Sequence, residues 1–241
     1  MDFYQVLANF YDEIFPLKAV HKEFLRSYLA REQIKSVLDV GCATGSYVLE
    51  LNDWGIETAG IDLSPDMIEI ARDKGRQRKS QAEFLLKDMR DLSEVSGTFD
   101  GILCLGNTLA HLTEEPHLLQ ALKQFGVKGR HLLLQLVNYD RVLEQQVTEL
   151  PEIRTSRLVF QRRYELLDNG LIRFSMELEL LAEGIKTQAS NLLVPLTKDK
   201  LESFFRAARW ESQSWWGSYA AEEWSTNTQA TIVSASFSDS N

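Results

Sequence analysis

The sequence is poor in cysteine, in basic charge and in long apolar runs. Its two cysteines and four histidines lack the spacing of a structural zinc site, so we expect no metal centre. Cys42 and Cys104 lie in apolar, strand-like segments, which predicts buried free thiols in a reducing compartment. The net charge of −9 disfavours a broad electrostatic contact with nucleic acid or with an anionic membrane.

Segments that could enter or cross a membrane are also missing. The longest apolar run, residues 132–137, is interrupted by Gln135 and is far too short to span a bilayer. The first residues lack the basic and apolar regions of a signal peptide. We therefore expect a cytoplasmic protein.

Short apolar segments alternate with amphipathic ones between about residues 36 and 138. Ser64 is the expected N-cap of the second helix, Pro65 its first residue and Gly75 its end. This alternation predicts parallel strands with helices on both faces, which is an α/β, doubly wound, Rossmann-like fold. The expected strands are residues 36–41, 56–64, 82–88, 99–107 and 130–138, and the expected helices are residues 46–55, 65–75 and 114–126.

The pattern changes on both sides of this region. Residues 3–30 are expected to be helical with a break near Pro16, and to pack on the sheet or form a lid over its carboxyl edge. After residue 153, two strand-like runs flank Asp168-Asn169-Gly170, a strong hairpin signal. A third strand at 186–196, a helix capped by Thr197 and two strands at 211–219 and 228–237 follow. We therefore predict a main domain of residues 1–152 and 196–241 with an antiparallel β insertion at 153–195.

The turn "GCATG" after the first strand is the candidate cofactor site. Gly41 allows a backbone conformation barred to other residues, and Gly45 lets the next helix start close to the sheet with free N–H groups. A dinucleotide site has the spacing G-x-G-x-x-G, whereas here Ala43 holds the middle position and the third glycine is missing. The turn therefore suits a ligand without a diphosphate.

Two carboxylates follow the next two strands. Asp62 lies 21 residues after Gly41, the distance at which a carboxylate accepts hydrogen bonds from ribose hydroxyls. Asp88 can accept from an adenine amino group while Met89 packs on the ring. Helix capping by Asp62 and a plain surface position for Asp88 are the alternatives. With the turn, these residues predict an adenosine-like ligand.

The segments "VLDVGCATG", "GIDLS" followed by "PDM", and "KDMRDL" resemble the successive cofactor motifs of class I S-adenosylmethionine-dependent methyltransferases. The resemblance covers about residues 36 to 140, and it implies a seven-stranded sheet with S-adenosylmethionine as the cofactor. The resemblance implies that Gly41, Ala43 and Gly45 surround the methionyl and ribose parts of the cofactor, that Asp39 supports the methionyl amine, and that Asp62 binds the ribose. It also implies that the adenine is contacted by Leu63, Met67, Asp88 and Met89. Leu105 would offer its backbone near the methionyl group.

The segments "LCLGNTLAHL" and "LQLVNYDRVLE" resemble those of glycine N-methyltransferase and related small-molecule N-methyltransferases. This likeness implies that Asn107, His111 and Asn138 bind the substrate, and that Asn138 donates to a substrate carboxylate or carbonyl. His111 could accept an amine proton. Turn capping by the two asparagines and a structural histidine are the alternatives.

The amino-terminal "ANFYDEIFP" resembles the leading helix of many small-molecule methyltransferases. The likeness implies that Tyr11, or else Tyr4, closes over the cofactor, and Lys18 is a candidate for the cofactor carboxylate. Core packing is the alternative for both tyrosines.

Two further clusters have a functional and a structural interpretation. Arginines can bind carboxylate or phosphate with two hydrogen bonds, or can cover a solvated strand face. Aromatic residues near the carboxyl terminus could border the acceptor or fill the core. The arginines of the insertion are Arg154, Arg157, Arg162, Arg163 and Arg173, and the aromatic residues are Trp215, Trp216, Tyr219 and Trp224.

These patterns together predict methyl transfer from S-adenosylmethionine to a small molecule, with an amine nitrogen as the favoured acceptor. The lid and the insertion, which we expect to cover the substrate site, favour a metabolite. The alternatives are a tRNA, rRNA or protein methyltransferase, a non-catalytic S-adenosylmethionine-binding module, and an NAD-dependent oxidoreductase. We expect no membrane partner and no nucleic acid, and the sequence leaves a homodimer open.

Overall fold

The computed structural model describes residues 2–238, and within that range seven strands form one sheet in the order β10-β11-β5-β4-β1-β2-β3. Strands β1 to β5 pair in parallel, whereas β11 pairs antiparallel with both β5 and β10. The α/β, doubly wound prediction is confirmed. The strands are β1 Ser36–Val40, β2 Glu57–Asp62, β3 Glu83–Leu86, β4 Phe99–Cys104, β5 Gly129–Val137, β10 Trp210–Trp216 and β11 Ala230–Phe237.

Helices cover both faces of this sheet, as the apolar strands require. On one face α5 (Glu115–Lys128) and α7 (Lys198–Ala207) pack on a cluster that includes Leu38 and Leu132. On the other face α2 (Ala19–Arg31) packs on Val37 and Leu133, with α3 (Ser46–Asp53) and α4 (Pro65–Arg78) beside it. The short helices η1 (Thr108–His111) and α6 (Tyr139–Glu144) follow β4 and β5.

Helix α4 differs from its predicted end. The Ser64 side chain caps it and Pro65 begins it, as expected, but the helix continues past Gly75 to Arg78. Gly75 lies inside the helix because β3 crosses closely there: a Cβ at this position would be 3.3 Å from Phe84 Cε2. The left-handed residue that ends the helix is Lys79, with φ of 55°.

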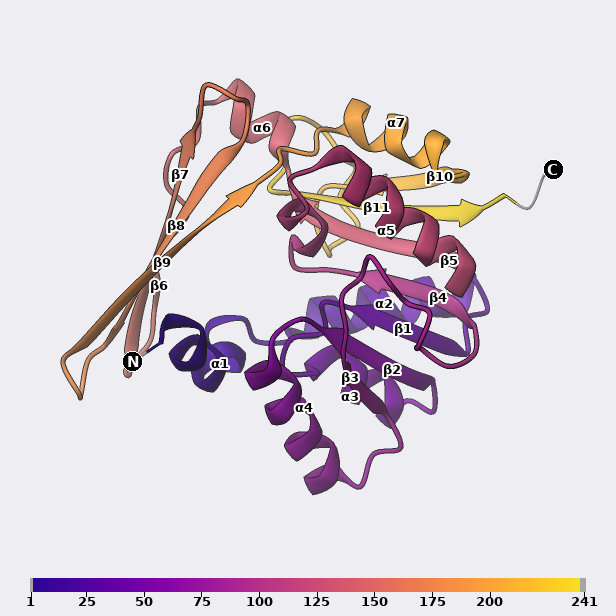
Figure 1. Cartoon of the computed structure of the whole chain (residues 1–241), viewed down its shortest axis with the longest axis horizontal. Helices are drawn as coiled ribbons and strands as arrows, with labels where there is room; N and C mark the ends of the chain where they lie inside the picture. Colours follow the sequence, from indigo (N-terminus) through magenta and orange to yellow (C-terminus); the bar gives the residue numbers. More distant parts are fainter. Residues whose placement is uncertain (1, 239–241) are drawn as a thin grey trace.

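The insertion forms a second sheet of four antiparallel strands within the described residues, in the order β6-β7-β8-β9. These are β6 Ile153–Arg154, β7 Leu158–Leu166, β8 Ile172–Leu180 and β9 Ile185–Leu193. The predicted hairpin is present, since Gly170 has φ of +78° and its N–H bonds to Leu167 O at 2.9 Å. Figure 1 shows this twisted sheet standing beside the main sheet, with α1 next to its lower half.

Helix α1 (Phe3–Ile14) joins the two sheets. Its apolar side is buried in one cluster with the inner face of the insertion and with Met67 and Ala43 of the main domain. Tyr4 adds a hydrogen bond from its hydroxyl to Asn191 Oδ1 of β9 at 2.7 Å. The break predicted near Pro16 is confirmed, because α1 ends at Ile14 and α2 begins at Ala19.

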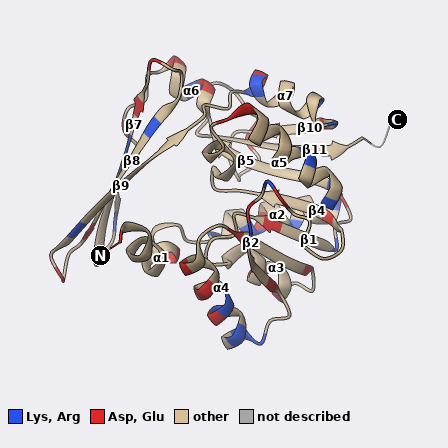
Figure 2. Ribbon diagram, viewed as in Figure 1, with Lys and Arg blue, Asp and Glu red and all other residues tan. Residues whose placement is uncertain are grey.

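The surface carries charges of both signs, and the two cysteines are as predicted. Basic and acidic positions are interspersed along α4 and along the strands of the insertion (Figure 2). Both cysteines are buried and free, as predicted. Between residues 2 and 238, no helix has the length and apolar character needed to cross a bilayer.

Replacing Gly45 with alanine is expected to lower the free energy of unfolding by about 2–4 kcal/mol. Its φ is +75°, and a Cβ there would lie 2.6 Å from Phe84 Cε1, so left-handed strain adds to overpacking. Gly55→Ala is the control, because Gly55 has φ of +83° with nothing within 4 Å of the added Cβ. We expect the control to lose about 1–2 kcal/mol in urea unfolding. Equal losses would show that the contact with Phe84 does not matter.

Candidate active site

The turn after β1 holds three residues in the left-handed region. Gly41, Ala43 and Gly45 have φ of 77°, 47° and 75°. The N–H groups of Gly41 and Cys42 donate to Ile61 O at 2.8 and 2.9 Å, which fixes the turn against the end of β2. Ala43 occupies a conformation that favours glycine, and its methyl group is buried in the cluster that includes α1. The alanine therefore contributes packing to the lid that a glycine could not.

Two carboxylates lie at the carboxyl ends of β1 and β2. Asp39 is 2% exposed, and burial together with the charge of Asp62 raises its pKa to about 7. Asp62 accepts hydrogen bonds from Ala43 N–H and Ser64 N–H, both at 2.9 Å, so it also braces the turn and the start of α4. Each Asp62 oxygen keeps a lone pair for a ligand hydroxyl.

Tyr11 of α1 lies over these carboxylates. Burial raises the pKa of the Tyr11 phenol well above its ordinary value, and the charges of Asp62 and Asp39 add to that shift. Tyr4 instead points to the insertion, as described above. Lys18 is exposed at the N-cap of α2, where its charge helps to lower the pKa of His21. Of the three amino-terminal candidates, Tyr11 is the one that the structure places beside the cofactor motifs.

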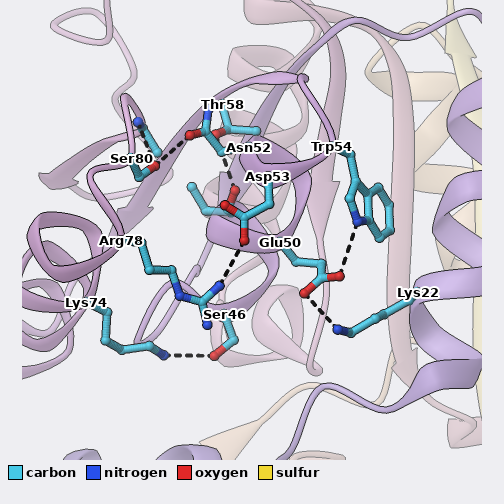
Figure 3. Close-up of polar contacts among 12 residues, drawn as sticks. Lys22, Ser46, Glu50, Asn52, Asp53, Trp54, Thr58, Lys74, Arg78 and Ser80 are labelled. Carbon is cyan, nitrogen blue, oxygen red and sulfur yellow. Dashed lines mark hydrogen bonds and ion pairs between the residues drawn. The ribbon is translucent and has the colours of Figure 1, made fainter.

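A polar cluster that the sequence did not reveal fastens α1 to the turn. The Asp12 carboxylate accepts from Thr44 Oγ1 at 2.6 Å, from Ser46 Oγ at 2.7 Å and from Lys74 Nζ at 2.7 Å. Lys74 also donates to Ser46 Oγ at 2.9 Å, a contact visible in Figure 3. These bonds join α1, the start of α3 and α4 directly beside Tyr11. We call Asp12, Thr44, Ser46 and Lys74 the lid cluster.

The adenine side of the predicted site carries an arginine partner. Both oxygens of Asp88 accept hydrogen bonds from Arg90, which lowers the pKa of Asp88. Met89 is partly buried, Met67 is buried, and Leu63 is 69% exposed. An adenine amino group would therefore share the Asp88 carboxylate with Arg90. The arginine two residues after Asp88 in "KDMRDL" is the sequence feature that could have predicted this pairing.

The two asparagines of the acceptor side are occupied by protein partners. Asn107 donates to the Tyr139 hydroxyl at 2.9 Å and accepts from Val137 N–H at 3.1 Å. Asn138 caps α6, and its amide donates to Ser225 O and Thr228 O, both at 2.9 Å. Both amide hydrogens of Asn138 are thus in use, which corrects the donor role that the resemblance implied. Asn138 therefore has the turn-capping role that was the alternative, whereas the Asn107 side chain makes no capping bond to η1 and instead joins β5 to α6.

His111 is the last residue of η1. Desolvation lowers the pKa of this imidazole, and the nearby charge of Asp62 acts in the opposite direction. His111 is therefore a neutral base at neutral pH, on the segment that packs against the turn: a Cβ on Gly41 would lie 2.4 Å from Thr108 Cγ2.

Leu105, like Leu103, belongs to the buried cluster on the α2 face, and its carbonyl accepts from Thr108 Oγ1 at 2.7 Å. The aromatic residues near the carboxyl terminus divide between two environments. Trp216 and Tyr219 pack on Phe24 of α2. The ring centres of Trp215 and Trp224 lie 5.0 and 4.7 Å from Lys198 Nζ.

The residues present fit S-adenosylmethionine. No hydrogen bond reaches the Asp39 carboxylate from any residue in 2–238, so the α-ammonium of a bound methionyl group would supply the cationic partner that the protein omits. Ribose hydroxyls match the open lone pairs of Asp62. The chemistry that this cofactor supplies is a methyl group activated on a sulfonium.

Comparison with known proteins agrees with this geometry. Residues 37–126 match the family model described as a methyltransferase domain. A glycine/sarcosine N-methyltransferase from Parasynechococcus marenigrum is 33% identical over 126 residues, which cover 51% of this chain and 45% of that relative. A second such enzyme, from Aphanothece halophytica, is 27% identical over 64% of this chain and 60% of its own length. The chain thus spans about half the length of the curated relatives it matches.

Solved structures show the same fold. An S-adenosylmethionine-dependent methyltransferase from Clostridium acetobutylicum aligns with a TM-score of 0.84 at 14% identity, over 98% of this chain and 99% of its own. An S-adenosylmethionine-bound amino pentose methyltransferase from Micromonospora echinaspora aligns with a TM-score of 0.68 at 20% identity, over 99% and 98% of the two chains. The fold, the motifs and the family match are those of class I S-adenosylmethionine-dependent methyltransferases. Residues 37–126 are the part of the chain that matches a methyltransferase domain, and the residues described above fit S-adenosylmethionine as the cofactor.

Asp39→Asn is expected to flatten the pH dependence of stability. The pKa of Asp39 is about 7 in the folded protein and about 3.9 in an unfolded chain. The native state therefore binds more protons between these values, and the free energy of unfolding falls as pH rises from about 4 to 7. Urea unfolding between pH 5 and 8 should lose this fall in Asp39→Asn.

The same variant should bind S-adenosylhomocysteine at least about tenfold more weakly by calorimetry, because a charged partner of the ligand ammonium is gone. Asp53→Asn, which removes an exposed carboxylate paired with Arg78, is the control and should change neither property. An unchanged pH profile in Asp39→Asn would contradict the assignment.

Lys74→Met is expected to weaken binding of S-adenosylhomocysteine about tenfold, since the lid cluster loses its cation and α1 is held less firmly over the turn. Arg76→Met is the matched control, because Arg76 lies on the same helix and pairs with Asp73 on the surface. Calorimetry on both variants is the measurement. Equal affinities in the two variants would show that the lid cluster does not contribute to cofactor binding.

Proposed function

We propose that the protein transfers the methyl group of S-adenosylmethionine to the amine nitrogen of a small molecule. The observation that carries this proposal is the packing of α1: one apolar cluster joins it to the inner face of the insertion and to the cofactor turn. An acceptor site roofed by a helix and a sheet suits a metabolite better than a folded macromolecule. The similarity to glycine/sarcosine N-methyltransferases supports a small amine acceptor.

The residues of this chain would act chiefly by positioning. Methyl transfer from a sulfonium is an in-line displacement with a neutral leaving group, so the enzyme must align the nucleophile and keep water out. Asp39 and Asp62 hold the two ends of the methionyl-ribose unit. Tyr11 and the apolar side of α1 exclude water above them.

A proton must leave the acceptor, because an ammonium has no lone pair for the methyl group. His111 is the side chain suited to take it, since its imidazole is neutral and lies on the segment after β4, within electrostatic reach of Asp62. A base with a pKa near or below neutrality releases the proton to solvent after each turnover.

The other hypotheses fit the site less well. A dinucleotide needs a turn that cradles a diphosphate, whereas this turn is closed by the Ala43–Asp62 hydrogen bond and by the contact between Gly45 and Phe84. A nucleic-acid substrate needs a basic surface, whereas the arginines of the insertion are largely paired with glutamates.

We expect S-adenosylhomocysteine to bind in the micromolar range or tighter, and S-adenosylmethionine to be consumed when a panel of small amines is supplied. Calorimetry and the release of S-adenosylhomocysteine measure the two properties. Hydroxyl compounds, tRNA and a protein mixture are the comparison acceptors. Absence of binding at about 1 mM ligand, or turnover with a macromolecule alone, would contradict the proposal.

A further inference from the structure

One arginine of the insertion differs from the other four. Arg154, Arg157, Arg163 and Arg173 each form an ion pair, and their partners are Glu152, Glu13, Glu149 and Glu165. All four side chains are largely exposed, so these pairs lie on the solvated side. Arg162 is half-buried and has no carboxylate partner among residues 2–238.

Arg162 lies on the inner face of the insertion. Side chains alternate along a strand, so Phe160, Arg162 and Tyr164 of β7 share one face. Phe160 packs edge-on against Phe15 at the end of α1, with ring centres 5.9 Å apart. Tyr164 is buried in the cluster of the main domain. The guanidinium therefore lies between the lid and the main domain.

The hydrogen bonding of this guanidinium is incomplete. Nη2 donates to Pro151 O at 2.8 Å, but Nε is buried without a partner in the described part of the chain. The Arg162 carbon Cζ is 5.5 Å from the Phe160 ring centre and 5.9 Å from that of Phe15. Burial lowers the pKa of Arg162. A buried donor without an acceptor is rare in proteins and calls for a ligand or a bound water.

A row of polar groups leads from Arg162 to the carboxyl ends of the strands. Tyr164 follows Arg162 on the same face of β7, and its ring lies in one buried cluster with Tyr139. The Tyr139 hydroxyl in turn accepts from Asn107 Nδ2 at 2.9 Å, directly after β4. Since methyl transfer in this fold occurs at this edge of the sheet, the far end of an acceptor that extends from it toward the insertion would approach Arg162.

We propose that Arg162 binds a carboxylate of the acceptor, so that the substrate is an amine that also carries a carboxylic acid. This inference rests on the proposed function for the amine end. The planar guanidinium offers two parallel N–H groups to a carboxylate, and one of these is the unpartnered Nε. A single cation matches one negative charge, whereas a phosphate dianion would call for a second.

The experiment compares amines supplied both as the free acid and as the primary amide: glycine, sarcosine, β-alanine and 4-aminobutyrate with their amides. Binding to the protein saturated with S-adenosylhomocysteine is measured by calorimetry, and turnover by S-adenosylhomocysteine release. We expect at least one acid to exceed its amide about tenfold in both affinity and kcat/KM.

Arg162→Met should abolish this preference, and Arg162→Lys should keep a weaker one because it retains the charge without the fork. Arg173→Met is the matched control on the neighbouring strand and should retain the full preference. All three variants should bind S-adenosylhomocysteine as the parent does, which also reports that they are folded.

The two proposals fail in different ways. Binding of an acid that depends on Arg162, without methylation of any amine, would refute the proposed function and keep the carboxylate site. Methylation of amines with equal rates for acid and amide would refute the carboxylate site and keep the function. Failure of every acid to bind at about 10 mM, or equal losses in Arg162→Met and Arg173→Met, would also overturn the carboxylate site.

Discussion

The site depends on one buried negative charge that the protein leaves without a cation. Asp39 lies near the end of β1, buried among apolar strands, and the carboxylate of Asp62 is the charge that raises its pKa further. Two like charges in a poorly solvated place are unfavourable unless a ligand compensates them. The left-handed turn and the start of α3 are arranged around this pair. A ligand that compensates these charges would therefore also stabilise the fold.

The glycines with left-handed backbone conformations in the turn after β1 are tightly packed against other segments. The space beside Gly41 is filled by Thr108, and the space beside Gly45 is filled by Phe84. The turn thus contacts both the segment after β4 and the strand β3. Displacement of the turn would disturb the acceptor segment that carries His111 as well as the cofactor motifs, because these parts touch directly.

The sequence predicted those elements of the fold that depend on residues close together in the chain. Strand periodicity located β1 to β5, and turn chemistry located the hairpin at Gly170, since both depend on residues adjacent in the chain. The end of α4 was predicted wrongly, because a glycine that makes room for Phe84 looks the same in the sequence as a glycine that ends a helix. Strand β3, not α4 itself, determines the role of Gly75.

In the candidate site, too, the sequence predicted what depends on neighbouring residues and missed what depends on contacts between distant ones. The motifs located Asp39 and Asp62, whose positions follow from strand ends. They missed the lid cluster, because Asp12 meets Lys74 only after α1 has folded across the domain. They could not show that the Asn138 amide is used by Ser225 and Thr228, about ninety residues later. Nor could they separate Arg162 from four similar arginines, because the distinction lies in which face of β7 is buried.

Helix α1 is shared by two neighbours, and this has a thermodynamic consequence. Its apolar side packs on the insertion, while Asp12 holds it to the cofactor turn. A movement that opens one contact strains the other, so the two sites open and close through a common element. Linkage then requires reciprocity: if the cofactor favours the closed helix and so tightens acceptor binding, the acceptor tightens cofactor binding by the same factor. Such cooperativity between the two ligands would arise within a single chain, without any second subunit.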